Sequence, residues 1–231
     1  MPTGSAPSVV RTAPDEGATG VDRATPLRVF YDRALDPRTV GRAEIALTSG
    51  ELAHFLEVRF DPVARSVVVR PFRGQRLEPN VRYTLTIDGV RDLDGTDAEP
   101  FALTFVTGEN AVDPSPSGTT EWATVEPIFA AHCVEGCHDG DGGLSLDLTS
   151  LEATRRSALG VPADQTGGTA TIGRLGLSGM ARIEESDPSR SYLIYKMLAD
   201  PHVWGEAMPP AGPLPLSDVA LVADWILGGA R

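Results

Sequence analysis

The chain has 231 residues, enough for two ordinary domains, and its 41% hydrophobic content is adequate for packed cores. Its formal net charge of −12 argues against nucleic acid or an anionic membrane surface as a partner. A run of about 18 apolar residues is absent, so no membrane span is predicted, and the first residues lack the features of a secretory signal.

Charge and cysteine are unevenly distributed along the chain. Residues 1–110 contain 13 arginines and 16 acidic residues, a net charge of −3. Residues 111–231 contain 7 basic and 16 acidic residues, a net charge of −9, and they hold both cysteines of the chain. Most of the acidity therefore belongs to the cysteine-containing part.

Short runs of β-branched and aromatic residues, separated by turn residues, fill the first half. The segment 81–87 (VRYTLTI) alternates polar and apolar residues as a half-buried strand does, and 65–70 carries three consecutive valines. The expected strands are 8–12, 26–31, 43–48, 53–60, 65–70, 81–87 and 100–106. This number of short strands in about 100 residues predicts an antiparallel β-sandwich.

The first half also resembles a known family. The segments that carry the resemblance are 14–21 (PDEGATGV), 29–40 (VFYDRALDPRTV), 77–85 (LEPNVRYTL), 90–95 (VRDLDG) and 101–107 (FALTFVT). They resemble the bacterial Ig-like domains of S-layer and other surface proteins. The resemblance implies an all-β Ig-like sandwich over residues 1–107, a structural or spacer module outside the cytoplasm that performs no chemistry.

Two polar features of this half have residue types that occur in ligand sites. Asp92, Asp94 and Asp97 carry carboxylates of the kind that bind calcium, but a hydrophilic turn between strands is the favoured interpretation. His54 lies within a predicted strand, and we expect a surface or half-buried residue there and not a metal ligand.

Residues 108–120 are rich in proline, serine and glycine and predict a linker between two domains. Thr120 is the expected N-cap of a helix that delivers the cysteines. The residues expected on one face of that helix are Trp122, Val125, Phe129 and Cys133.

Further helices are expected beyond the cysteines. Thr149 or Ser150 can cap a short helix that ends near 159, a glycine-rich loop follows over 160–180, and another helix begins in the segment 186–189. The last helix is expected to begin at Ser217 and to stop at the glycine pair 228–229. Residues 121–231 are therefore predicted to form a small all-α domain with long loops, built around a bound prosthetic group.

Cys133 and Cys137, with His138 directly after them, form the motif that suggests chemistry. Covalent haem attachment needs two thiols, which add to the vinyl groups of the porphyrin, and an adjacent imidazole that ligates the iron. The usual spacing places two residues between the cysteines, whereas here there are three. The motif is thus one residue longer than the standard one.

Met208 lies in a proline-rich loop 70 residues after His138 and is suited to be the second axial ligand of a haem. His202 is the alternative sixth ligand. His132 is too constrained by its helix to reach the opposite haem face. Met180 and Met197 are expected to be core or loop residues.

The cysteine pair has three other possible uses. Cys133 and Cys137 could form a disulfide, because the i,i+4 spacing on a helix brings them near the required separation. With His132 and His138 they could hold zinc, although such a set is crowded on one turn. A thioredoxin-like redox pair would need a βαβ context that the sequence does not show.

The second half resembles the c-type cytochrome domains of bacterial surface and periplasmic proteins. The matching segments are 127–133 (PIFAAHC), 137–138 (CH), 142–146 (GGLSL), 187–193 (DPSRSYL), 208–210 (MPP) and 223–226 (ADWI). The resemblance implies one covalent haem c, with thioether bonds at Cys133 and Cys137, His138 as proximal ligand and Met208 as distal ligand. The extra residue requires a bulge, which Gly136 can supply.

These features predict a single-haem electron carrier and not an enzyme, because six-coordinate iron leaves no position for a substrate. We expect a periplasmic or extracellular location and redox proteins as partners, with the negative charge steering basic partners. The alternatives are a surface structural or adhesion protein with a disulfide and no haem, or an electron-transfer subunit of a larger oxidoreductase. The sequence does not distinguish a monomer from a homo-oligomer or a haem-chain assembly.

Overall fold

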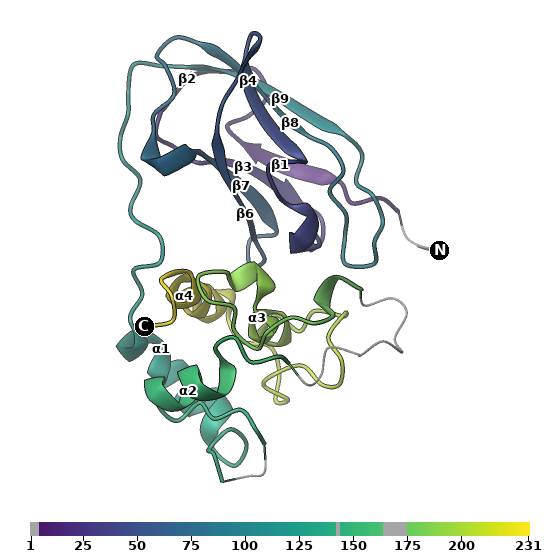
Figure 1. Cartoon of the computed structure of the whole chain (residues 1–231), viewed down its shortest axis with the longest axis vertical. Helices are drawn as coiled ribbons and strands as arrows, with labels where there is room; N and C mark the ends of the chain where they lie inside the picture. Colours follow the sequence, from purple (N-terminus) through teal and green to yellow (C-terminus); the bar gives the residue numbers. More distant parts are fainter. Residues whose placement is uncertain (1–4, 142–143, 164–174) are drawn as a thin grey trace. The chain divides into compact units, whose positions relative to one another are not determined.

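The structure, a computed structural model, describes residues 5–141, 144–163 and 175–231 (Figure 1). The chain divides into two compact units, Met1–Ser115 (unit 1) and Pro116–Arg231 (unit 2), and each is described by itself. Among the described residues, none of the helices has the length and apolar character needed to cross a membrane.

Unit 1 consists of two β-sheets (Figure 1). The first sheet has the order β1 (Val9–Ala13), β3 (Leu27–Tyr31), β7 (Ser66–Pro71), β6 (Leu56–Asp61). The second has the order β2 (Ala18–Val21), β9 (Phe101–Thr107), β8 (Arg82–Ile87), β4 (Ile45–Ser49), β5 (Leu52–Ala53). Neighbouring strands are antiparallel except β2 and β9, which are parallel.

The core of unit 1 is one cluster of side chains contributed by both sheets. In β8 the alternate residues Tyr83, Leu85 and Ile87 are buried, as the polar–apolar alternation predicts. The valines of β7 are buried on both faces of the strand, which suits its position between β3 and β6. The predicted Ig-like β-sandwich is therefore confirmed for this unit.

The strand predictions needed two corrections. The strand expected over 53–60 is divided into β5 and β6, because the chain passes from one sheet to the other at His54 and Phe55. The strand β2 was not predicted, since its sequence ATGV is short and contains glycine, and its pairing with β9 at the sheet edge leaves no local signal.

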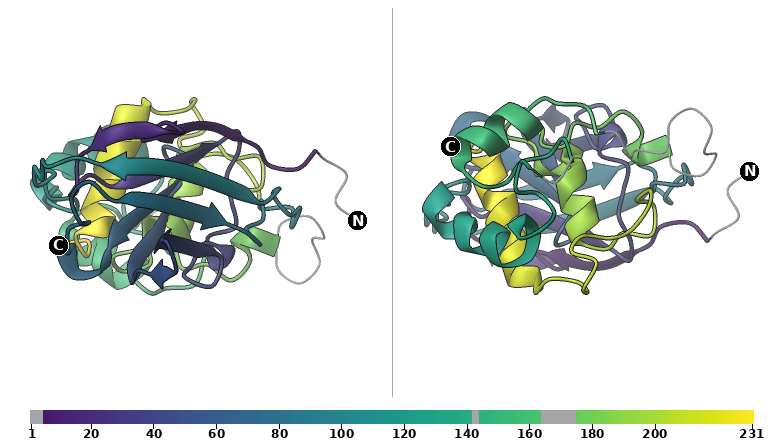
Figure 2. Two further views of the ribbon diagram at one scale, coloured as in Figure 1. Left: turned by 90° about the horizontal axis from the view of Figure 1, so that it is seen from above. Right: turned by 90° about the horizontal axis from the view of Figure 1, so that it is seen from below.

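The regular elements of unit 2 are helices joined by long segments, with isolated β-bridges in place of strands in its described part (Figure 2). The α-helices are α1 (Trp122–Phe129), α2 (Leu151–Ala158), α3 (Tyr192–Met197) and α4 (Leu216–Leu227). A π-helical turn, Ala130–Val134, continues α1, and a 3₁₀ turn, Pro188–Arg190, precedes α3. The unit is thus helical but rich in loops, and its description as a cytochrome-like fold stays a prediction.

An aromatic triangle forms the centre of the unit 2 core. The Trp225 ring on α4 is fully buried and lies 5.6 Å from the Trp122 ring and 6.0 Å from the Phe129 ring, both on α1. The Trp225 indole N–H donates to the Arg231 carbonyl at 2.9 Å, so its polar edge is also satisfied. These contacts fix α1, which leads into the cysteine segment, against the last helix.

The start of unit 2 is held by Asp224 of α4. Its carboxylate accepts hydrogen bonds from the backbone N–H groups of Gly118 at 2.6 Å and Thr120 at 3.1 Å, and from the Thr120 hydroxyl at 2.7 Å. The prediction that Thr120 caps α1 is therefore wrong, because Asp224 engages the hydroxyl and the helix begins at Trp122. A Cβ added to Gly118 would lie 2.8 Å from the Gly228 nitrogen, so the two backbones meet there in direct contact.

Other helix predictions fare differently. Ser150 caps α2 through a hydrogen bond from the Ala153 N–H, and Asp187 caps the 3₁₀ turn before α3. The last helix begins at Leu216, one residue before the predicted Ser217. Residues 142–143 of the cytochrome-like pattern and 164–174 of the predicted loop lie outside the described residues.

Candidate functional site

A cavity of about 210 Å³ in unit 2 brings together most of the residues that the sequence singled out. The pattern-derived residues that line it are His132, Cys133, Cys137, His138 and Met208. Its apolar lining residues are Leu144, Leu146, Leu148, Ala163, Leu193, Met197, Pro209 and Pro210. Its remaining lining residues are Ser145, Arg182, Tyr192 and Lys196. The cavity therefore combines an apolar interior with soft sulfur and imidazole groups.

The cysteine segment begins in a π-helical turn and ends in a tight loop. Cys133 lies in the turn Ala130–Val134, and its carbonyl accepts a hydrogen bond from the His138 N–H at 3.1 Å. The Cys137 N–H donates to the Val134 carbonyl, also at 3.1 Å. The π-helical turn, a kind of turn that often occurs at functional sites, therefore holds Cys133, and the two hydrogen bonds close the loop from Cys133 to His138 after it.

Gly136 lies within this loop with a φ angle of +69°, a backbone conformation that side chains with a Cβ disfavour. No heavy atom lies within 4 Å of the position that a Cβ would occupy, so only the backbone angle requires glycine here. The loop thus has the conformation that the bulge expected across the three-residue spacing would need.

The two cysteines differ in environment. Cys137 is exposed, whereas Cys133 is half-buried, and burial, together with the neighbouring Cys137, raises the pKa of the Cys133 thiol to about 11. Cys133 is therefore a protonated thiol at neutral pH and a poor nucleophile by itself. Both cysteines are free in the structure.

His138 is oriented by the segment that follows it. Its Nδ1 lies 3.1 Å from the Leu146 carbonyl oxygen, which can only accept, so Nδ1 carries the proton of this hydrogen bond. In the neutral ring Nε2 is then left with a lone pair, and the ring lines the cavity. A histidine that donates one ring N–H to a backbone carbonyl is the usual arrangement of a metal ligand.

Met208 lies on a loop that α3 holds in place. The Met208 N–H donates to the Lys196 carbonyl at 3.0 Å. The Lys196 ammonium donates to the carbonyls of Trp204 at 2.5 Å and Glu206 at 2.8 Å. Burial lowers the pKa of Lys196, an effect that the nearby Glu206 carboxylate opposes. The methionine therefore reaches the cavity wall from a loop with several defined backbone anchors.

The alternative ligands are placed differently. His202 is not among the residues that line the cavity, and its Nδ1 lies 2.7 Å from an Asp200 carboxylate oxygen. His132 is exposed and lines the cavity next to Cys133. Met197 lines the cavity from α3, whereas Met180 is a buried residue that is not among the lining residues.

The zinc alternative receives no support. In the described ranges of the chain, no three His, Cys, Asp or Glu side chains are arranged so that they could hold a metal ion together. A haem iron needs fewer protein ligands, one imidazole and one thioether, because the porphyrin supplies the other four.

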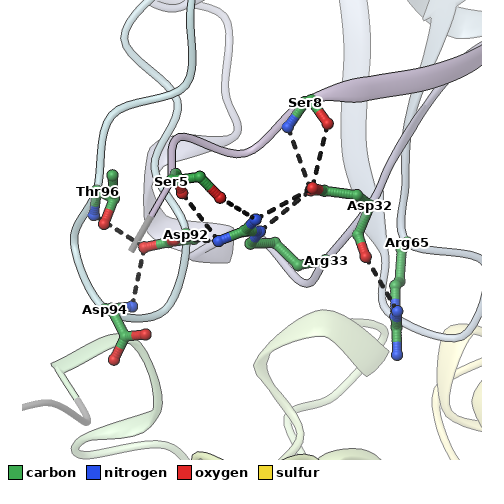
Figure 3. A network of polar contacts seen from close by, with 8 residues as sticks. All are labelled: Ser5, Ser8, Asp32, Arg33, Arg65, Asp92, Asp94 and Thr96. Atoms are coloured by element: carbon green, nitrogen blue, oxygen red, sulfur yellow. Dashed lines mark hydrogen bonds and ion pairs between the residues drawn. The ribbon is translucent and has the colours of Figure 1, made fainter. Parts of the chain in front are cut away.

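The Asp92 region of unit 1 is a structured turn (Figure 3). The buried Asp92 carboxylate accepts hydrogen bonds from the N–H groups of Asp94 at 3.0 Å and Thr96 at 2.8 Å, and it lies 3.7 Å from the Arg33 guanidinium. Asp97 forms an ion pair with Arg91 at 2.6 Å. These carboxylates therefore serve the turn and its neighbours, in agreement with the favoured interpretation of a hydrophilic turn.

Arg33 also connects this turn to the start of the described chain (Figure 3). Its guanidinium donates to the Ser5 carbonyl at 2.9 Å and binds the Asp32 carboxylate at 3.1 Å. Asp32 in turn accepts a hydrogen bond from the Ser8 N–H. The network is a structural anchor for the segment before β1.

His54 is half-buried, as expected. Its Nε2 lies 2.8 Å from the Ser49 hydroxyl, and its ring lies 5.2 Å from the Tyr83 ring. It serves to connect the β4–β5 hairpin to the sandwich.

Sequence reasoning missed Lys196 and Arg182 as cavity residues. Arg182 donates to the Ser157 carbonyl of α2 at 2.7 Å and to the Ser145 hydroxyl. Its side chain therefore connects α2 with the segment that precedes this helix. Lys196 is the single lysine of the chain and lies in the helix YLIYKM, otherwise without charge. A solitary charge in such a helix is the signal that could have identified it.

Comparisons with known proteins concern the Ig-like part. Residues 3–107 match the family model described as "Bacterial Ig-like domain", so unit 1 contains a bacterial Ig-like domain. No curated protein sequence matches the chain significantly.

Similar solved structures include domains 1–6 of the surface layer protein SbsC, with 16% identity and a TM-score of 0.37, covering 47% of this chain and 14% of that one. The methionine-rich copper resistance protein PcoC from Escherichia coli has 16% identity and a TM-score of 0.36, covering 45% of this chain and 99% of that one. CopC from Methylosinus trichosporium OB3b has 14% identity and a TM-score of 0.36, covering 46% and 99%. At such TM-scores the likenesses say nothing about activity.

Proposed function

We propose that unit 2 binds one haem covalently through Cys133 and Cys137 and transfers electrons, and that the Ig-like domain is its spacer. The observation that carries the proposal is the single cavity lined by both cysteines, His138 and Met208. These residues come from segments 70 positions apart in the sequence, and the fold brings them to one apolar cavity.

The residues fit the chemistry of attachment. Each thiol S–H would add across one vinyl group, with the sulfur on one carbon and the hydrogen on the other, so no oxidant is needed. This addition requires both cysteines as reduced thiols. The π-helical turn and the positive φ of Gly136 support the proposal, because they shape the loop between the two thiols.

The residues also fit axial ligation. The hydrogen bond from His138 Nδ1 to the Leu146 carbonyl leaves Nε2 for a metal, and Met208 offers a thioether that favours ferrous iron. A bound haem would supply a one-electron couple between ferrous and ferric iron. With both axial positions taken, the protein would carry electrons and would not act as an enzyme on its own.

Location and partners follow from the rest of the chain. A surface or periplasmic location fits the bacterial Ig-like domain and the covalent mode of haem attachment. The net charge of −9 over residues 111–231 favours a basic redox partner, with an attraction that salt weakens. If the protein is a subunit of a larger oxidoreductase, a catalytic chain should copurify with it.

A surface structural protein without haem is the second candidate. It is favoured by the family match, which concerns residues 3–107 and suits a structural role at the cell surface. In that case Cys133 and Cys137 would form a disulfide on exposure to air, and the mass would fall by two hydrogens.

Visible spectroscopy separates the two candidates. The full chain is expressed with a haem c maturation system and extracted with acid–acetone; the proposal expects the haem spectrum to stay with the protein. A colourless protein after extraction would contradict the proposal and favour the structural role.

The distal ligand is tested in the same preparation with two volume-conserving variants. Met208→Leu should abolish the sulfur-to-iron charge-transfer band, whereas Met180→Leu, at a buried position that does not line the cavity, should keep it. If Met208→Leu keeps the band, the distal assignment is wrong.

A further inference from the structure

Helix α3 forms a platform for the loop that ends at Met208. At one end of the loop, the Trp204 N–H donates to the Tyr192 hydroxyl at 2.8 Å. At the other end, the Met208 N–H donates to the Lys196 carbonyl at 3.0 Å. Tyr192 and Lys196 are four residues apart, so they lie on the same face of the helix.

Lys196 holds the centre of this loop with its side chain. Its ammonium reaches the carbonyl oxygens of Trp204 and Glu206 at 2.5 and 2.8 Å, and it lies 5.8 Å from the Tyr192 ring centroid. The side chain is only 6% exposed, and burying an ammonium is costly unless acceptors replace water. Two backbone carbonyls of the same loop are those acceptors.

The choice of residue is informative because the chain otherwise uses arginine. All the basic residues except Lys196 are arginines, 19 of the 20. Lysine presents a compact ammonium with donors that diverge, whereas arginine presents a planar fork suited to carboxylates. At Lys196 the compact ammonium reaches two carbonyls two residues apart in a buried position, where the larger planar guanidinium would have to fit the same space.

We propose that Lys196 is the positioning residue for Met208, and that it fixes the 204–208 loop so that the thioether stays at the cavity wall. The role as a support for an axial ligand rests on the proposed function, whereas the fixing of the loop does not. Lys196 is also among the residues that line the cavity, so a positive charge close to it would favour the ferrous state of an iron bound there and raise its potential.

The first test measures the loop without reference to haem. Amide hydrogen exchange is followed by mass spectrometry in the full-length wild type, in Lys196→Met and in Lys196→Arg. Losing the two ammonium–carbonyl hydrogen bonds should speed exchange over residues 204–208 by about tenfold or more. Unchanged exchange in both variants would overturn the proposal, and Arg190→Met, at an exposed position outside the cavity, is the matched control.

A second measurement uses the wild type alone and covers the case in which Lys196→Met does not fold. Lys196 carries the only side-chain amine, so an amine-reactive reagent labels this residue and the α-amino group. We expect slow labelling of Lys196 and fast labelling of the α-amino group. Equal rates would show that the ammonium is not held by the loop and would contradict the proposal.

The role of Lys196 in positioning Met208 is tested in the haem-loaded protein. Lys196→Met should keep the covalent haem but weaken the sulfur-to-iron band and lower the reduction potential, and Lys196→Arg should restore part of both. A haem-loaded Lys196→Met with an unchanged band and potential would overturn the positioning role. If the wild type retains no haem, the proposed function fails, while the exchange and labelling results still decide whether Lys196 fixes the loop.

Discussion

The two units are stabilised by different kinds of contact. In unit 1 nearly every strand pairs with neighbours, and one cluster of side chains fills the space between the two sheets. In unit 2 single side chains bind backbone groups of distant segments: Asp224 binds 118–120, Arg155 binds the carbonyls of Gly229 and Ala230, and Lys196 binds the 204–206 carbonyls.

The difference teaches where a ligand site can form. A sandwich whose inner faces meet leaves its interior filled by its own side chains. A unit held by separate anchors can keep an apolar cavity, and whatever fills that cavity adds to the stability of the folded state. Stability of unit 2 should therefore depend on its aromatic core and a few side-chain anchors, and stability of unit 1 on the core that its two sheets share.

The largest expected effect comes from Trp225→Ala. The indole is fully buried in the aromatic triangle, so its removal should lower the free energy of unfolding of unit 2 by about 3–5 kcal/mol. Amide exchange in the full chain should then rise across α1 and α4 and stay unchanged in β7 and β8, because unit 1 has its own core. The matched core variant Leu85→Ala should raise amide exchange in β7 and β8 and leave it unchanged in α1 and α4. If either variant raised exchange equally in both units, the comparison between the units would be contradicted.

Asp224→Asn comes next. It replaces a charged acceptor of several hydrogen bonds, so unit 2 should lose about 2 kcal/mol at neutral pH, measured by denaturant unfolding. Burial raises the pKa of Asp224, but the hydrogen bonds from Gly118, Thr120 and Thr119 outweigh it and hold the pKa below the ordinary 3.8.

The sign of the pH dependence follows from that lowered pKa. A carboxylate whose folded-state pKa is lowered adds stability above pH 3.8, and this stability is lost as the pH falls through the folded-state pKa. The difference between wild type and Asp224→Asn should therefore be constant near neutral pH and shrink below 3.8. A difference that grows on acidification would contradict the assignment.

Gly136→Ala should cost about 1 kcal/mol, because alanine is strained at a positive φ even though no atom obstructs its Cβ. Gly17→Ala in unit 1 has the same problem at φ +72° with equally open space, so the thermal shifts should be similar. Only Gly136→Ala should reduce covalent haem yield. Equal haem yields from the two variants would show that the backbone conformation at Gly136 does not affect haem attachment, and would contradict this prediction.

The smallest effect is expected from calcium. The Asp92 carboxylate is occupied by the Asp94 and Thr96 N–H groups and by Arg33, so calcium or a chelator should leave the melting temperature of unit 1 unchanged. A rise of several degrees on adding calcium would contradict the structural interpretation of this turn.

Much of unit 1 was predictable from two local patterns. The VRYTLTI segment alternates with a period of two, and the continuous valine run is typical of a strand buried on both faces; the structure has strands β8 and β7 there. The strand β2 was not predicted, because it pairs with β9, more than 80 residues away, and its own sequence does not alternate between polar and apolar residues.

In unit 2 residue type and spacing singled out Cys133, Cys137, His138 and Met208, which line one cavity, while the residues that support their segments were not predicted. Thr120 has the residue type of a helix cap, but its hydroxyl donates a hydrogen bond to Asp224, 104 residues later, and does not cap the helix. Lys196 was missed because its partners are backbone carbonyls, which every residue has and no sequence pattern marks. Long-range bonds between a side chain and the backbone are thus the part of a site that sequence reasoning finds least easily.

The most direct test of the central claim is the intact mass of the denatured protein after expression with haem c maturation. The wild type should carry the added mass of one haem, Cys133→Ser and Cys137→Ser should each retain at most a single thioether link, and the double variant should carry none. A wild-type mass equal to that of the polypeptide alone, or lower by two hydrogens, would contradict the claim.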